Sequence, residues 1–410
     1  MNGLGARLII VVFCPFAAGF FLSFLFRNVT AVIAKDLAGT FALTSSELGL
    51  LTSAYFLSFA AMQVPVGIFL DRYGPRRVVA GLLLVAGLGS SMFAMADSML
   101  TLALARALVG VGVSACLMGS MKAFTLWFPL ERMSSLNGMM IAAGGLGGLA
   151  ATTPIEYGAA AWGWRSMFWL LGALCVASAA YIALVVPEKR LPGAGESWRE
   201  AFRRMGTLFC IPLFWRVGLP MMTVHGTFQA LIGLWLAPWL IDVVGLPRGE
   251  AANWLFAAVF SYTLGSIVFG VGADHLAARG IARLSLLKWG TAAAIAALFG
   301  LAAVPAQGKF PLLLAYTFMV IAPVLSYVLL TRHFAPELSG RVNTALNVAM
   351  FVVSFSAQWG VGAILRFYPA EGSRYAAEGY AVAFGVLAAF HLAAWLWLAV
   401  LEREPEPYRA

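Results

Sequence analysis

The chain has 410 residues, of which 61% are hydrophobic and 11% are charged, and its formal net charge is +9 at pH 7. Soluble globular proteins have roughly 45–50% apolar and about 25% charged residues, so this composition excludes a soluble enzyme. About 20 apolar residues make one membrane-spanning helix, and a chain of this length holds about twelve such helices with their loops. The four cysteines have neither disulfide nor zinc-ligand spacing.

Apolar segments follow one another along the chain, separated by charged or turn-rich loops. Each segment is long enough to satisfy its own backbone hydrogen bonds as a helix that crosses lipid. The first six lie at 8–34, 48–70, 78–97, 100–128, 134–157 and 165–186. The next six lie at 211–241, 252–271, 284–304, 310–332, 342–365 and 379–401.

These segments predict an all-α membrane protein with twelve transmembrane helices in two six-helix bundles. The N-terminal bundle is expected over 1–188 and the C-terminal bundle, with a short tail, over 211–410. The polar stretch at 189–210 is expected to be a cytoplasmic linker between them.

Lysine and arginine gather in alternate connections, and membrane proteins keep such connections in the cytoplasm. Both termini are therefore predicted to be cytoplasmic, in a multi-pass protein of a bacterial inner membrane. The excess positive charge favours anionic lipid headgroups as partners rather than nucleic acid. The residues of these connections are Arg72, Arg76, Arg77, Arg132, Lys189, Arg190, Arg199, Arg203, Arg204, Arg279, Arg283, Lys288 and Arg341.

Two charged patterns of the first half of the chain recur in the second half, and the separation along the sequence is nearly the same for both. Duplicated halves are typical of a transporter whose substrate site lies between them, near the middle of the bilayer. The repeated pairs are Gly67 and Asp71 with Gly270 and Asp274, and Glu131 and Asn137 with Glu337 and Asn343.

Several motifs resemble the major facilitator superfamily over the whole chain. They are Gly67-Ile-Phe-Leu-Asp71-Arg72-Tyr-Gly74-Pro-Arg76-Arg77, Arg106-Ala-Leu-Val-Gly110-Val-Gly112, Gly163-Trp164-Arg165 and Pro187-Glu188. The resemblance implies two six-helix bundles that rock about a central cavity.

The first of these motifs is expected to act in gating. Asp71 lies at a helix end, where its carboxylate can pair with arginines of the neighbouring bundle and hold one state closed. An ordinary helix end with positive-inside arginines is the alternative interpretation. The predicted gating residues are Gly67, Asp71, Arg72, Arg76, Arg106 and Asp274.

The membrane-spanning segments contain more basic than acidic side chains. An ionisable residue at mid-membrane costs at least ~2.5–3.5 kcal/mol, so it is expected to face a cavity or a partner. The basic residues are Arg27, Arg106, Lys122 and Arg216, whereas Asp36, Glu156 and Asp242 lie near helix ends. This imbalance suits a small organic anion, such as a carboxylate or phosphate ester, as substrate.

Arg27 in the first helix and Lys122, five residues before Trp127-Phe128-Pro129, resemble the organic-anion symporter branch of the family. The resemblance implies that both hold a substrate carboxylate. The alternative is that each extends to the headgroups at its own membrane face. The sequence also departs from the branch. Phe26 and Leu130 replace acids, and Lys122 replaces an arginine, which removes the usual proton-carrying groups.

His225 and Gln229 lie one turn apart on the predicted seventh helix and share a face. A histidine titrates near neutral pH and could carry a coupled proton, although a histidine bonded within the bundle is an equal alternative. Tyr55, Asn347 and Gln358 are further polar candidates for the substrate site. No metal site and no cofactor are predicted.

The leading hypothesis is a monomeric secondary active transporter that moves a small organic anion by alternating access, with protons as a candidate coupling ion. It is not expected to be an enzyme. The alternative is an efflux pump for hydrophobic compounds, which the Phe- and Met-rich first, second and fourth segments permit. The scarcity of membrane-embedded acids counts against efflux of cations.

Overall fold

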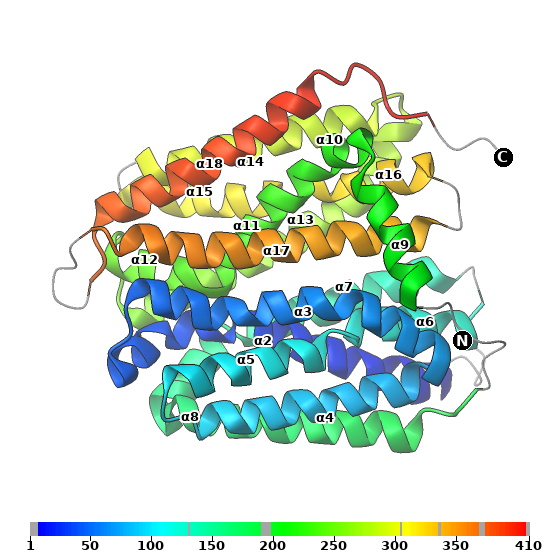
Figure 1. Ribbon diagram of the computed structural model, residues 1–410. Coiled ribbons are helices and arrows are strands. Elements are labelled where there is room, and N and C mark those ends of the chain that lie inside the picture. The colour runs from blue at the N-terminus through cyan, green and yellow to red at the C-terminus, as the bar shows by residue number, and fades with distance from the viewer. Residues whose placement is uncertain are drawn as a thin grey trace. The chain divides into compact units, whose positions relative to one another are not determined.

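A computed structural model describes residues 7–129, 132–189, 198–303, 306–334, 338–368 and 374–406. These residues form helices and no β-sheet (Figure 1). The helices before the linker are η1 (Ile9–Phe13), α2 (Cys14–Phe41), α3 (Ser45–Tyr73), α4 (Pro75–Ala94), α5 (Met99–Val113), α6 (Cys116–Trp127), α7 (Met133–Ala150) and α8 (Thr153–Val185).

The second half of the chain continues the helical pattern. Its helices are α9 (Trp198–Phe209), α10 (Pro212–Pro220), η3 (Met221–His225), α11 (Gly226–Ala230), η4 (Leu231–Trp235), α12 (Leu236–Asp242), α13 (Arg248–Ala278), α14 (Arg283–Ala303), α15 (Ala306–Met319), η5 (Ala322–Val324), α16 (Leu325–His333), α17 (Ser339–Leu365) and α18 (Ala377–Ala399).

Eleven helical stretches of the described chain are long and apolar enough to cross a membrane. One of them, Ser135–Val185, has 51 residues, which at ~1.5 Å per residue is more than twice a hydrocarbon core of about 30 Å. Gly163 has φ +79° and breaks the helix inside this stretch. It therefore holds two spans, and the predicted twelve-helix fold is confirmed.

The chain divides into two compact units. Unit 1 comprises Met1–Leu43 and Ala54–Ala201, and unit 2 comprises Thr44–Ser53 and Phe202–Ala410. The later division falls within the predicted linker, where Trp198–Phe209 folds as the helix α9. The first turns of α3 belong to unit 2, because the Ser45 hydroxyl donates to the Gly362 carbonyl at 2.8 Å.

Local sequence explains where α3 begins and ends. Thr44 and Glu47 form a capping box, in which the Thr44 N–H donates to Glu47 Oε2 at 2.9 Å and the Glu47 N–H donates to Thr44 Oγ1 at 3.3 Å. After α3, Gly74 adopts φ +80°, and Pro75 occupies the first turn of α4. A left-handed glycine followed by proline gives the sharp turn within the Gly67–Arg77 motif.

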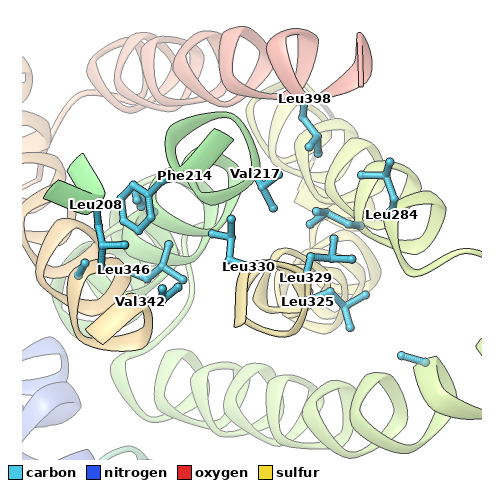
Figure 2. Close-up of a cluster of buried hydrophobic side chains, with 14 residues drawn as sticks. Leu208, Phe214, Val217, Leu284, Leu325, Leu329, Leu330, Val342, Leu346 and Leu398 are labelled. Atoms are coloured by element: carbon cyan, nitrogen blue, oxygen red, sulfur yellow. The ribbon is translucent and has the colours of Figure 1, made fainter. Parts of the chain in front are cut away.

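The interior of unit 2 contains a continuous apolar cluster, shown in Figure 2. It joins the end of α9 to α10, α14, α16, α17 and α18 and is made by aliphatic side chains around Phe214. Its labelled members are Leu208, Phe214, Val217, Leu284, Leu325, Leu329, Leu330, Val342, Leu346 and Leu398. The cluster fixes the C-terminal end of α9 to this unit.

Three short segments have π-helical hydrogen bonding, which the sequence did not predict. Ile9–Phe13 opens the first span, and Met221–His225 and Leu231–Trp235 interrupt the seventh. π-helical turns are rare and frequently occur at functional sites. His225 lies in the first π-helical turn of the seventh span, and Gln229 lies between the two π-helical turns of that span.

Candidate functional site

Arg27 is buried in unit 1, with 6% of its surface exposed. Its guanidinium carbon lies 4.5 Å from the ring centroid of Phe24 and 5.6 Å from that of Phe59. Aromatic faces attract cations, more strongly where water is excluded. The protein therefore encloses this cation among rings of α2 and α3 and does not extend it to the lipid headgroups.

Arg106 from α5 reaches the same turn of α2. It is 1% exposed, and its Nη1 donates to the Phe26 carbonyl at 2.9 Å. Its guanidinium lies 5.0 Å from the ring centroid of Tyr55, whose hydroxyl donates to the Ser23 carbonyl at 3.3 Å. Among the described residues, no carboxylate pairs with Arg106.

Arg27 and Arg106 are called the arginine pair below. Tyr55 faces Arg106 and Phe59 faces Arg27, and the two ring centroids are 5.9 Å apart. Successive turns of α3 therefore supply a continuous aromatic surface to both cations. The sequence placed Arg106 in the gate, and the packing of α5 on α2 brings its guanidinium to the carbonyl of Phe26, the residue before Arg27.

Lys122 lies elsewhere in unit 1. Its Nζ donates to Asp71 Oδ1 at 2.9 Å, and the two side chains are 36% and 48% exposed. Its neighbour Phe124 stacks on Phe13 at a centroid distance of 5.5 Å.

These contacts fix the register of the antiparallel first and fourth spans. Arg106 meets Phe26, whereas Phe124 meets Phe13. At ~1.5 Å per residue, Lys122 and Arg27 are therefore separated by roughly 18 Å along the helix axis. The structure does not bring these two residues together, and a single carboxylate group does not bridge that distance.

Asp71 pairs with Lys122 of its own unit. Its motif neighbours contact other groups. Arg72 lies over the ring of Tyr73 at 5.5 Å, and Arg76 Nε donates to the Ala183 carbonyl at 3.0 Å. The Asp71 and Arg76 contacts connect the end of α3 to α6 and the start of α4 to α8 within unit 1.

The structure does not test the gating role of Gly67 or Asp274. A Cβ added to Gly67 would meet no atom within 4 Å, so packing does not require glycine there. The side chain of Asp274 lies outside the described part of the structure, as do Glu131 and Glu337 of the repeat.

His225 and Gln229 are both buried in unit 2, with 6% and 4% exposure. The imidazole centroid lies 5.8 Å from the Tyr262 ring and 6.1 Å from the Phe228 ring. Phe228 and Tyr262 stack on each other at 4.8 Å. The predicted histidine is therefore held in an aromatic setting at the π-helical turn.

The amides predicted for the substrate site make protein contacts. Asn347 Oδ1 accepts from the Tyr327 hydroxyl at 2.6 Å, and Gln358 Nε2 donates to the Ala230 carbonyl at 3.3 Å. Among the described residues, Gln358 Oε1 has no hydrogen-bond partner and is buried. Gln358 thus retains an acceptor that a donor on a substrate could use.

Sequence reasoning missed a second buried histidine in unit 2. His391 on α18 is 1% exposed, and its Nε2 lies 3.1 Å from the Thr227 hydroxyl. The signal was its position within the apolar 379–401 segment, between Phe390 and Leu392. Thr227 lies two residues after His225, so His391 contacts the seventh span close to His225 in the sequence.

The family model described as Major Facilitator Superfamily matches residues 16–358. The probable sulfoacetate transporter SauU of Cupriavidus necator is 25% identical over 63% of this chain and 64% of its own length. The match thus spans less than two thirds of that transporter. The galacturonate transporter of Dickeya chrysanthemi is 24% identical over 62% of this chain and 77% of its own.

The fold also resembles solved structures. The crystal structure of a D-xylose-proton symporter superposes with a TM-score of 0.79 at 16% identity, covering 98% of this chain and 100% of that one. At this identity the similarity concerns the fold alone.

Proposed function

The chain belongs to the Major Facilitator Superfamily, and we propose that it is a secondary active transporter that moves a small organic anion across the membrane by alternating access. The similar proteins named above are a probable sulfoacetate transporter and a galacturonate transporter, and sulfoacetate and galacturonate are organic anions. They support this substrate class for the present chain.

The observation that carries the proposal is the arginine pair. Arg106 is fully buried and makes hydrogen bonds only to a backbone carbonyl among the described residues. A buried guanidinium without a negative neighbour is costly. A carboxylate, sulfonate or phosphate oxygen bound here would offset that cost, and the planar guanidinium fork suits such groups.

In this proposal Arg27 and Arg106 bind the acidic group of the substrate, and Tyr55 orients Arg106. His225, Gln229, Asn347 and Gln358 are the polar residues proposed to bind the rest of the substrate. Lys122 pairs with Asp71 and is assigned to the gate. Gly67, Arg72, Arg76 and Asp274 keep the gating role that their motif implies.

Protons are the proposed coupling ion, with His225 as carrier. Its burial beside Tyr262 and Phe228 isolates it from bulk water, and a histidine can change charge near neutral pH. The orientation with both termini in the cytoplasm is proposed from the distribution of lysine and arginine.

The test is uptake into proteoliposomes of labelled carboxylates, sulfonates and phosphate esters, together with thermal stabilisation of the purified protein by each compound. Arg27→Lys and Arg106→Lys are expected to lower affinity for the transported anion at least tenfold, because lysine lacks the bidentate fork.

Arg165→Lys is the matched control. Arg165 also donates to a backbone carbonyl, that of Ala96 at 2.8 Å, and lies over an aromatic ring, that of Trp164 at 4.3 Å. The Arg165→Lys substitution should leave affinity for the transported anion unchanged. Stabilisation by hydrophobic cations and by no anion would contradict the proposal and favour export of hydrophobic compounds.

A further inference from the structure

The helix α9 has an amphipathic pattern that transport of an anion does not explain. Trp198, Phe202, Met205 and Phe209 recur at helical spacing and share one side of the helix. Arg199, Arg203 and Arg204 lie on both flanks of that side. Aromatic rings bordered by arginines are typical of helices that lie in a membrane interface.

The two ends of α9 differ in how they are covered. At the C-terminal end, Leu208 is 1% exposed and inserts into the apolar cluster of unit 2 (Figure 2). At the N-terminal end, Trp198 is 42% and Phe202 is 49% exposed. The edge of the Trp198 ring contacts Phe69 at a centroid distance of 5.6 Å, which leaves much of both rings uncovered.

The direction of α9 fits an interface rather than a span. In Figure 1, α9 runs across the direction of α16 and α17, to which the cluster around Leu208 attaches it. Arg199 and Arg203 are both exposed beside the uncovered rings. A surface that combines exposed aromatic rings with arginines is complementary to acidic headgroups above hydrocarbon.

We propose that α9 binds anionic phospholipid headgroups at the cytoplasmic surface of the membrane, with the rings of Trp198 and Phe202 inserted at the boundary of the acyl chains. Arg199 and Arg203 supply the attraction, which reaches only about a Debye length from the surface. Leu208 anchors the other end to unit 2. The inference does not depend on which substrate is carried.

Cys210 provides a native position for the test, because it is exposed and directly follows α9. A Cys14→Ser variant leaves Cys116 and Cys175, which are buried, so a nitroxide label reacts at Cys210. The full-length labelled protein is placed in nanodiscs of phosphatidylcholine, with or without phosphatidylglycerol. Collision rates with oxygen and with a water-soluble nickel chelate then report the depth of the label.

The expected result is deeper immersion of the label when phosphatidylglycerol is present, and loss of this shift in Arg199→Glu/Arg203→Glu. High salt should abolish the shift in the parent protein without any substitution. Arg366→Glu/Arg374→Glu makes the same change in net charge at exposed positions outside α9 and should retain the shift.

Three results would overturn the proposal. They are equal immersion in both lipid compositions, immersion that survives the α9 double substitution, and loss of the shift in both double variants. The last would show that only net charge matters. None of these results bears on anion uptake, so a failure here leaves the proposed function intact.

Discussion

Lys122 and Asp71 form an ion pair of 2.9 Å that joins α6 to the end of α3 within unit 1. Both side chains are more than a third exposed, and ion pairs in such settings stabilise by about 0–1 kcal/mol. The pair therefore contributes little to stability, and its importance lies in which groups it engages. It places Lys122 with the gating motif and apart from the arginine pair.

The first prediction concerns this separation. Lys122→Ala should leave anion affinity, measured by ligand-induced thermal stabilisation, unchanged within about twofold, because roughly 18 Å of helix separates Lys122 from Arg27. The transport rate should change, and to the same extent in Asp71→Ala and in the double variant, since one interaction is lost in all three. A tenfold loss of affinity in Lys122→Ala would return this lysine to the substrate site.

The second prediction separates the ring of Tyr55 from its hydroxyl. Tyr55→Phe keeps the aromatic face 5.0 Å from the Arg106 guanidinium and loses only the hydrogen bond to Ser23. It should bind the transported anion nearly as the parent does. Tyr55→Leu removes the face and should weaken binding several-fold, because Arg106 is then no longer held in place. Equal affinities in the two variants, measured by isothermal titration, would contradict this role.

The third prediction concerns proton coupling. His225→Gln should abolish accumulation of the anion driven by a pH gradient while sparing exchange of anion for anion, since only the titrating group is removed. Both are measured as uptake into proteoliposomes. Loss of both activities together would indicate a structural histidine.

His391→Gln serves as the matched control for this experiment. His391 is at least as deeply buried as His225 in the same unit, and its Nε2 lies 3.1 Å from the Thr227 hydroxyl. The substitution should lower the melting temperature, because it disturbs a buried hydrogen bond, and should keep gradient-driven accumulation. Retained accumulation in His225→Gln with loss in His391→Gln would reassign the proton to α18.

The fourth prediction compares two motif glycines. A Cβ on Gly112 would lie 2.2 Å from the Ala86 backbone nitrogen, whereas a Cβ on Gly67 meets nothing within 4 Å. Gly112→Ala should therefore destabilise the protein by about 1–3 kcal/mol through overpacking. Gly67→Ala should leave the melting temperature unchanged or raise it, while altering transport if the gating role is correct. Thermal unfolding in one detergent measures both, and equal melting temperatures would contradict the close packing of α4 on α5.

Hydropathy predicted the fold because every membrane-spanning segment must form its backbone hydrogen bonds within itself. The twelve segments and the family resemblance are confirmed. The predicted site is a different matter. Arg27 and Lys122 were grouped by motif resemblance, but proximity depends on the register between antiparallel helices. The contact of Arg106 with Phe26 sets that register. The sequence pattern of a single helix does not reveal how that helix is aligned against its neighbour. The positions proposed for substrate binding and gating stay predictions.

The linker shows a second limit. The polar stretch at 189–210 was expected as a cytoplasmic linker with no helix assigned to it, yet Trp198–Phe209 folds as α9. Its apolar side was visible in the spacing of Trp198, Phe202, Met205 and Phe209, but the charged residues between them dominated the composition. Docking of Leu208 into the cluster of unit 2 supplies the packing that a short helix needs.

The two π-helical turns of the seventh span affect how residues are matched between proteins. Each i to i+5 turn accommodates an extra residue relative to a regular α-helix, and one residue corresponds to roughly 100° of rotation about the axis. Any alignment that treats Met221–Trp235 as uninterrupted helix will assign side chains beyond each turn to the wrong face. Roles borrowed from other proteins for Gln229 and the residues after it should therefore be matched in three dimensions, not by counting along the chain.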